Sequence, residues 1–179
     1  MESKRSVILF IAMSLDGYIT GPNEDLGFLS MVEKEGEDYG YSEFVKTVDT
    51  VIIGRKTYDK VVSIGHQYPQ TVKEAYIITR SERPPVENFQ YYRGSPKDLV
   101  AKLRSQEGKN IYCDGGAEII HELLLHRLID EVIVSVIPVL LGEGISLFKG
   151  GRPQQNMKLV TSKQFDTGLV QLHYKMDGK

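Results

Sequence analysis

A short segment that combines a glycine, two cations and a hydroxyl could bind a phosphate group. The segment, residues 54–58, reads Gly-Arg-Lys-Thr-Tyr and lies between an apolar run and a stretch of helical pattern. A helix start offers unpaired N–H groups and a partial positive charge, and a glycine lets the backbone approach a ligand closely. Short basic turns are also common on solvated surfaces, so this segment alone leaves both interpretations open. The candidate residues are Gly54, Arg55, Lys56 and Thr57.

A second glycine-containing segment repeats this arrangement later in the chain. Residues 114–118, Asp-Gly-Gly-Ala-Glu, join another apolar run to another stretch of helical pattern. Paired glycines allow close backbone contacts with a ligand, but a tight turn between strand and helix could also need them for its own geometry. A dinucleotide carries separate phosphates. Two such segments on parallel strands therefore predict a dinucleotide site more strongly than either does alone.

Other nucleotide-binding and catalytic motifs are absent from the sequence. No Gly-x-Gly-x-x-Gly follows a strand, since residues 142–147 read Gly-Glu-Gly-Ile-Ser-Leu, and there is neither a Walker loop nor a Gly-x-Ser-x-Gly elbow. His121 and His126 are five residues apart. On a helix they diverge by roughly 140°, whereas the zinc motif needs a four-residue spacing that aligns them. We therefore expect ordinary helix residues there and no metal site.

Strands and helices that must position these segments alternate through most of the chain. Continuous apolar runs are typical of strands covered on both faces, and apolar residues at helical spacing indicate amphipathic helices. The pattern predicts strands at residues 7–13, 51–53, 75–79, 89–92, 111–113, 131–141 and 169–176. It predicts helices at residues 41–48 and 57–62 and from 117 to about 129. A further helix should begin at Pro96 and be ended by Gly108.

The order of these elements predicts a mixed sheet. Strand and helix alternation is typical of parallel crossovers, and the strands that follow residue 130 predict an antiparallel hairpin at one edge. Pro138 should mark a bend in the strand at 131–141. Apolar and polar residues alternate in the strand at 169–176, so one of its faces should be exposed to solvent.

Composition indicates one ordinary globular domain over residues 1–179. The chain has 41% hydrophobic and 26% charged residues with a formal net charge of -2, which gives no electrostatic case for nucleic acid or acidic membranes. Its apolar runs are too short to span a bilayer. Cys113 is the only cysteine, and the opening segment does not have the pattern of a signal peptide. These features favour a reducing cytoplasm.

Four segments in this order resemble a known superfamily. They are residues 14–19 (Ser-Leu-Asp-Gly-Tyr-Ile), the two glycine segments, and residues 138–144 (Pro-Val-Leu-Leu-Gly-Glu-Gly). Together they resemble the dihydrofolate reductase-like superfamily, and more closely its branch related to the reductase domain of bacterial riboflavin biosynthesis. The resemblance covers nearly the whole chain. It implies a three-layer α/β fold with an eight-stranded, mostly parallel mixed sheet flanked by helices, and NADPH lying across the carboxyl edge.

The resemblance also implies roles for individual residues. Ala12 and Ile19 would border the nicotinamide, and Arg55, Lys56 and Thr57, following Gly54, would hold phosphates on the adenosine side. Thr79 and Arg80 would flank the adenine ribose and its 2′-phosphate. The pyrophosphate would be received by Gly115, Gly116, Ala117, Glu118 and Ile119. We expect Gly116→Val to block NADPH while leaving the fold largely intact.

The acid on the substrate side is less closely defined. Dihydrofolate reductases place a catalytic carboxylate on the helix before the Gly-Arg turn, and the matching position here is Asp38. Asp38 could equally cap that helix or be solvated in an acidic loop. Asp16 is a second candidate, for substrate binding, although an Asp-Gly pair is most simply a turn former. The sequence has no tryptophan, which departs from the folate-reducing pattern and puts folate in doubt as the substrate.

The resulting hypothesis is an NADPH-dependent reductase of a pterin, pyrimidine or riboflavin-precursor ring. Two alternatives stay open: a reductase of an unrelated small carbonyl or imine, and a noncatalytic NADPH-binding protein of the same fold. The expected partner is a small-molecule substrate, and related proteins are consistent with a homodimer.

Overall fold

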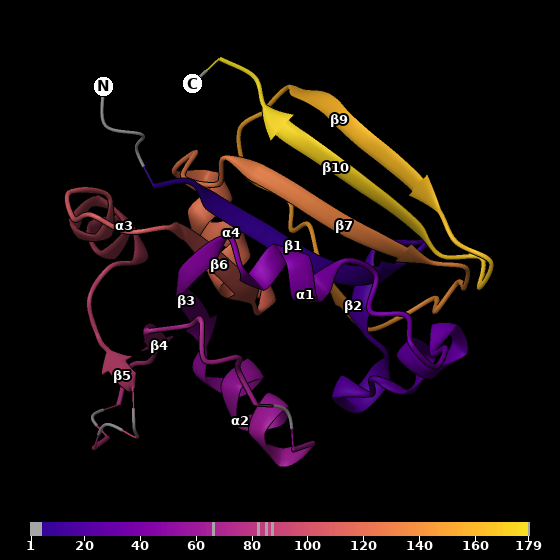
Figure 1. Ribbon diagram of the computed structural model, residues 1–179, viewed down its shortest axis with the longest axis horizontal. Helices are drawn as coiled ribbons and strands as arrows, with labels where there is room; N and C mark the ends of the chain where they lie inside the picture. Colours follow the sequence, from indigo (N-terminus) through magenta and orange to yellow (C-terminus); the bar gives the residue numbers. More distant parts are fainter. Residues whose placement is uncertain (1–4, 66, 82, 85, 87, 179) are drawn as a thin grey trace.

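An eight-stranded mixed sheet forms the middle layer of the protein (Figure 1). The computed structural model describes residues 5–65, 67–81, 83–84, 86 and 88–178. The strand order is β5-β4-β3-β6-β1-β7-β10-β9, parallel from β5 to β7 and antiparallel from β7 to β9. The strands are β1 (Val7–Ser14), β3 (Val48–Gly54), β4 (Glu74–Ile78), β5 (Phe89–Tyr92), β6 (Asn110–Gly115), β7 (Glu131–Ile137), β9 (Met157–Gln164) and β10 (Val170–Met176). The predicted α/β fold with its mixed sheet and C-terminal hairpin is confirmed.

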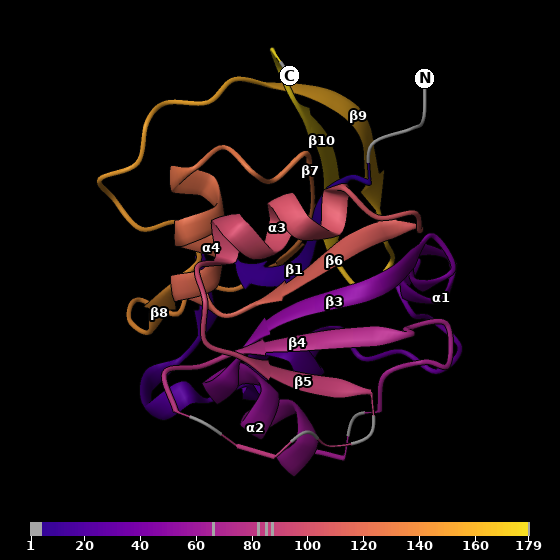
Figure 2. The same cartoon turned by 90° about the vertical axis from the view of Figure 1, so that its left-hand side faces the viewer.

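Helices cover both faces of this sheet. Figure 2 shows α3 (Pro96–Arg104) and α4 (Ala117–Leu125) together on one face. Their apolar residues share a buried cluster with Val7 and Leu9 of β1. On the other face, α1 (Tyr41–Val45) and α2 (Arg55–Ser63) share a second cluster with Ile8. Successive residues of β1 thus enter opposite cores, as the period of a strand requires, which explains its continuous apolar run.

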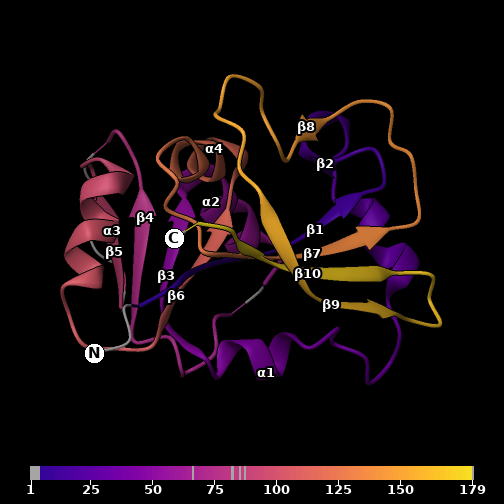
Figure 3. The same ribbon diagram turned by 90° about the horizontal axis from the view of Figure 1, so that it is seen from above.

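A smaller sheet lies beyond the carboxyl ends of β1 and β7 (Figure 3). It pairs β2 (Tyr18–Thr20) with β8 (Ile145–Ser146), and two short 3-10 helices, η1 (Pro22–Glu24) and η2 (Gly27–Val32), follow β2. The sequence pattern predicted neither strand. Within the described part of the chain, no helix is both long enough and apolar enough to cross a membrane.

Three predicted helix boundaries were wrong. The helix predicted at 41–48 ends at Val45, and Val48 already belongs to β3. The helix expected to run until Gly108 ends at Arg104, where the N–H of Ser105 turns back to Lys102 O.

The helix expected to reach residue 129 ends at Leu125. Arg127 adopts a left-handed backbone with φ 54°, and the N–H of Leu128 donates to Leu123 O at 2.8 Å. This is a Schellman ending, in which the chain reverses and satisfies the last carbonyls. It is built here without glycine, which is the usual signal for such a stop.

The strand predicted over 131–141 was too long. β7 ends at Ile137 and Pro138 follows directly. Because proline has no N–H for the ladder, the strand stops there instead of bending. The next segment continues toward β8 as a loop.

Candidate functional site

Two glycine turns meet at the carboxyl edge of the sheet. Gly54 ends β3 and Gly115 ends β6, and these neighbouring strands pair Ile53 with Gly115. A Cβ atom added to Gly54 would lie 3.3 Å from the backbone nitrogen of Gly116, and one added to Gly116 would lie 2.5 Å from Thr57 Oγ1. The segments that the sequence suggested as phosphate sites therefore touch each other. A side chain at Gly116 would meet Thr57 Oγ1 and should therefore cost stability, so the expectation that Gly116→Val leaves the fold largely intact stays a prediction.

Each turn begins a helix whose cap is a glycine. Gly54 caps α2 and Gly116 caps α4, and each helix has nine residues. A glycine cap has no side chain to accept a hydrogen bond, so neither cap residue satisfies the N–H groups of the first helical turn. Two adjacent helix starts also combine their partial positive charges. This edge is suited to a ligand with more than one phosphate.

Charged side chains surround the start of α4. Glu118, in the first turn, forms an ion pair with Lys149. Lys149 lowers the pKa of the Glu118 carboxyl below its usual value, with smaller contributions from His121 and Arg80. Glu118 opposes the binding of an anion at this helix start unless Lys149 neutralises its charge.

The residues predicted to bind the adenosine end of the cofactor differ in whether their side chains already have partners in the protein. Arg55 Nη1 pairs with Asp59 Oδ2 at 2.8 Å along α2. Lys56 is exposed. Thr79 directly follows β4 and is buried, and its Oγ1 accepts a hydrogen bond from the N–H of Ser81 at 3.2 Å. Thr79 is thus fixed in the fold, whereas Lys56 can turn toward a ligand.

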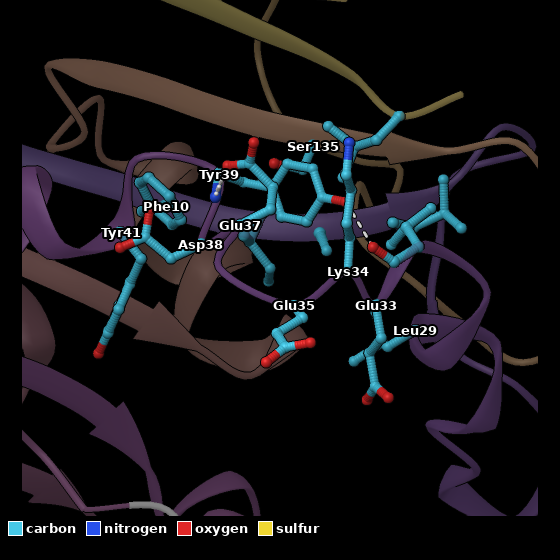
Figure 4. A pocket seen from close by; sticks show the side chains of 15 residues that line it. Phe10, Leu29, Glu33, Lys34, Glu35, Glu37, Asp38, Tyr39, Tyr41 and Ser135 are labelled. Carbon is cyan, nitrogen blue, oxygen red and sulfur yellow. Dashed lines mark hydrogen bonds between the residues drawn. The ribbon is translucent and has the colours of Figure 1, made fainter. Parts of the chain in front are cut away.

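A cavity of about 620 Å³ opens on the face of the sheet covered by α1 (Figure 4). Its floor comes from Phe10 and Ala12 of β1 and from Ser135 and Ile137 of β7. The loop before α1 forms one side. Ala12 is therefore placed at the cavity, as the nicotinamide prediction requires. Ile19 instead packs against the core on the face of α3 and α4.

Asp38 lies at the rim of this cavity and is exposed. Its carboxylate accepts hydrogen bonds from the N–H groups of Gly40 and Ser42, both at 2.9 Å. Hydrogen bonds from Ser42 lower the pKa of Asp38 below its usual value. Because α1 begins at Tyr41, Asp38 precedes the helix instead of lying on its inner face. These contacts correspond to the capping alternative.

Asp16 connects two loops beside the carboxyl end of β1. Its carboxylate accepts hydrogen bonds from Ser14 Oγ at 2.5 Å and from the N–H groups of Leu141 and Gly142 at 3.1 and 2.8 Å. The bond from Ser14 is the main reason that the pKa of Asp16 is lowered. The predicted substrate contact is thus a residue whose oxygens already hold the segment 138–144 against the segment 14–19.

One carboxylate in the predicted motif has neighbours that the sequence did not reveal. Asp114 accepts hydrogen bonds from the phenols of Tyr68 and Tyr112. Tyr112 is two residues before Asp114 on one strand, a spacing that could have suggested the contact. Tyr68 comes from the loop after α2, and no pattern in that loop connects it with β6.

His121 lies in α4, and His126 directly follows its last residue. His126 pairs with Glu122 at 3.2 Å along the helix. No group of ligating side chains in the described ranges could hold a metal ion.

Comparisons with known proteins identify one family model and several similar chains. The family model for the RibD C-terminal domain matches residues 5–171. YwjB of Bacillus subtilis (strain 168) is 39% identical over 172 residues, which cover 96% of this chain and 98% of YwjB. A putative riboflavin biosynthesis protein from Shewanella sp. PV-4 superposes with a TM-score of 0.88 at 27% identity, covering 97% of this chain and 99% of that chain. Dihydrofolate reductase from Enterococcus faecalis, complexed with NADP(H), shares the fold with a TM-score of 0.64 at 14% identity, covering 98% of both chains.

Proposed function

The chain belongs to the RibD C-terminal domain family, and on this premise we propose that it is an NADPH-dependent reductase that transfers hydride to a pterin, pyrimidine or riboflavin-precursor ring. The observation that carries the proposal is the contact between the turns at Gly54 and Gly116. Two glycine-capped helix starts on adjacent parallel strands match the separate phosphates of a dinucleotide. A structural neighbour with the same fold is complexed with NADP(H), which supports this choice of cofactor.

The chain's own residues would bind and orient the cofactor and the substrate. The backbone N–H groups at the starts of α2 and α4 would hold the pyrophosphate, and Arg80 would pair with the 2′-phosphate. Ala12, with its small side chain on the cavity floor, would leave room for a flat ring against β1. When bound, the reduced nicotinamide supplies the hydride, and the protein supplies position and surroundings.

We assign Asp38 as the acid nearest to the reacting ring in this proposal. It lies at the cavity rim, and its lowered pKa keeps it ionised at neutral pH. An ionised carboxylate binds an N–H group of the substrate instead of donating a proton. Asp16 would act indirectly, by holding the loop that follows β1.

Cofactor binding and hydride transfer need separate tests. Titration calorimetry with NADPH and NADH measures binding, and loss of reduced-nicotinamide absorbance with dihydropterins, aminouracils and small imines measures transfer. Tight NADPH binding with turnover of at least one ring supports the proposal. NADPH binding without oxidation by any member of the panel would favour the noncatalytic binding protein, and failure to bind either cofactor would refute both.

A further inference from the structure

The floor of the cavity contains a buried hydroxyl among apolar neighbours. Ser135 is the only polar one of the four residues that form the floor. It lies opposite Ala12 of β1 and opposite Gln171 of β10, so the three side chains form a row on one face of the sheet. Ser135 is 5% exposed and Gln171 is 8% exposed. Because burying a polar group without a hydrogen bond costs free energy, the bonds of this pair decide what the floor offers a ligand.

The backbone of Tyr39 fixes the orientation of the Gln171 side-chain amide. Gln171 Nε2 lies 2.9 Å from Tyr39 O and 3.1 Å from Ser135 Oγ. A backbone carbonyl oxygen can only accept a hydrogen bond, so the amide atom that faces it must be the nitrogen and not the oxygen. Both hydrogens of that nitrogen are then used, one on Tyr39 O and the other on Ser135 Oγ.

Tyr39, which also lines the cavity, is held in place from several sides (Figure 4). Its phenol donates a hydrogen bond to Val32 O, and its hydroxyl oxygen lies 2.9 Å from Thr167 Oγ1. Its ring packs edge-on against Phe165 at a centroid distance of 4.8 Å. Because these contacts fix Tyr39, its carbonyl holds the Gln171 amide in one orientation.

The Ser135 hydroxyl therefore keeps its own hydrogen for another acceptor. A serine hydroxyl has one hydrogen to donate, and here its oxygen accepts from Gln171. No other described residue forms a hydrogen bond with Ser135 Oγ. Since Ser135 lines the cavity, this hydrogen can reach an atom of a bound ligand. The floor thus offers a hydrogen-bond donor, which complements an acceptor on the ligand.

A flat ring on this floor would place one edge beside the donor. The small side chain of Ala12, next to Ser135 across the strands, leaves room for such a ring. A carbonyl oxygen or an unprotonated ring nitrogen at that edge would accept the hydrogen of Ser135, whereas an amino group would bring a second donor to it. A site built to hydrogen-bond one group discriminates against an analogue that lacks it, because the buried polar group is then left unpaired.

We propose that Ser135 determines the substrate specificity of the cavity by donating a hydrogen bond to an acceptor on the substrate ring, and that Gln171 is the residue that positions this hydroxyl. The inference rests on the proposed reductase function and names the substrate class for it. That class consists of flat heterocycles whose edge next to β7 carries a carbonyl oxygen or an unprotonated ring nitrogen.

The test compares two bicyclic probes of the same shape. Benzimidazole has a ring nitrogen that accepts a hydrogen bond, and indole has a carbon at that position. Titration calorimetry measures the affinity of the full chain for each probe, with and without saturating NADPH, at a pH at which benzimidazole is neutral. Ser135→Ala should weaken benzimidazole about three- to tenfold and change indole by less than about twofold. The ratio of the two affinities therefore reports the hydrogen bond.

Three further variants separate the hydrogen bond from packing. Ser135→Thr keeps the hydroxyl and should keep the wild-type ratio of the two affinities within about twofold. Gln171→Met removes the amide that orients the hydroxyl, so the ratio should fall toward that of Ser135→Ala. Ser162→Ala is the matched control, because Ser162 is an exposed serine of β9 on the opposite face of the sheet, and it should leave the ratio unchanged. If Ser135→Ala does not fold, a crystal of the wild type with benzimidazole decides the point, and a ring nitrogen within about 3.2 Å of Ser135 Oγ supports the proposal.

Several results would overturn the inference. They are an equal loss of both probes in Ser135→Ala, a ratio in Ser135→Thr as low as that in Ser135→Ala, an equally large effect of Ser162→Ala, benzimidazole that lies elsewhere in the crystal, or a wild type that binds neither probe. A wild-type ratio in Gln171→Met would refute the positioning role of Gln171. Failure of the inference is distinguishable from failure of the proposed function. An unchanged ratio in Ser135→Ala with intact NADPH binding refutes the role of Ser135 alone, whereas a wild type that does not bind NADPH refutes the reductase.

Discussion

The contact between the two glycine turns predicts a large effect for the smallest side chain. In Gly116→Ala, the new methyl would lie 2.5 Å from Thr57 Oγ1, whereas ordinary contact begins at 3.4 Å. One group must therefore move by about 1 Å. The next nearest atom, Thr57 Cβ, would be 3.9 Å away, so the collision involves a single hydroxyl. The backbone at Gly116, with φ -76°, adds no strain of its own.

Overpacking of this kind costs about 1 to 3 kcal/mol. For a chain of this length, each kcal/mol lowers the melting temperature by about 2 to 4 °C. We expect Gly116→Ala to melt roughly 2 to 12 °C below the wild type. Gly150→Ala is the matched control, because a Cβ atom there meets nothing within 4 Å. It should melt within about 2 °C of the wild type.

A second substitution tests the cause. Thr57→Ala removes the hydroxyl, so adding it to Gly116→Ala should recover most of the lost stability, with a coupling energy of about 1 to 3 kcal/mol. Thermal unfolding of the wild type, the single variants and the double variant gives this energy. The added methyl at the start of α4 should weaken NADPH binding in Gly116→Ala and equally in the double variant, because both contain it. Strictly additive effects on stability, or a Gly116→Ala variant as stable as Gly150→Ala, would refute the contact between the turns.

Four further predictions concern the proposed cofactor site and its surroundings. Arg80→Ala should weaken NADPH roughly ten- to a hundredfold and leave NADH unchanged, as measured by titration of both cofactors at fixed ionic strength. Glu118→Gln should tighten NADPH binding by removing the carboxylate that Lys149 now neutralises, and a salt titration should show that the gain shrinks at high ionic strength. Asp38→Asn should lower turnover more than NADPH affinity, as pH-resolved kinetics with an accepted substrate would show; normal turnover at every pH would exclude Asp38 from the reaction. Cys113, fully buried with its thiol pKa raised by burial to about 12, should react with a thiol reagent only as the protein unfolds, and rapid labelling of the native protein would contradict its burial.

The strands of the sheet could be predicted from the sequence where both of their faces are buried. The apolar runs that form β1 and β6 appeared because helices cover both of their faces. β9 gave no such signal, because all of its residues are exposed and its sequence shows no apolar face. The end of α4 was also missed, since Arg127 adopts the left-handed conformation that a glycine normally signals.

The candidate site was predictable only where local sequence defines it. The turns at Gly54 and Gly116 follow from the types of their residues, and the sheet brings them together as parallel neighbours should lie. Asp38 was placed by counting from a related motif, and the structure puts it before α1 instead of within it. The contact of Tyr68 with Asp114 joins a loop to a distant strand, and no local pattern encodes such a pairing.

The place of β1 in the sheet has a consequence for how the protein folds during its synthesis. β1 is synthesised well before β6 and β7, yet it lies between these two strands in the sheet. Until those strands leave the ribosome, one of the most apolar stretches of the chain has no partner on either edge. Long-range pairing of this kind makes folding slow and leaves a nascent strand open to aggregation. The nascent chain should therefore depend on chaperones that shield β1 until most of the sheet has been synthesised.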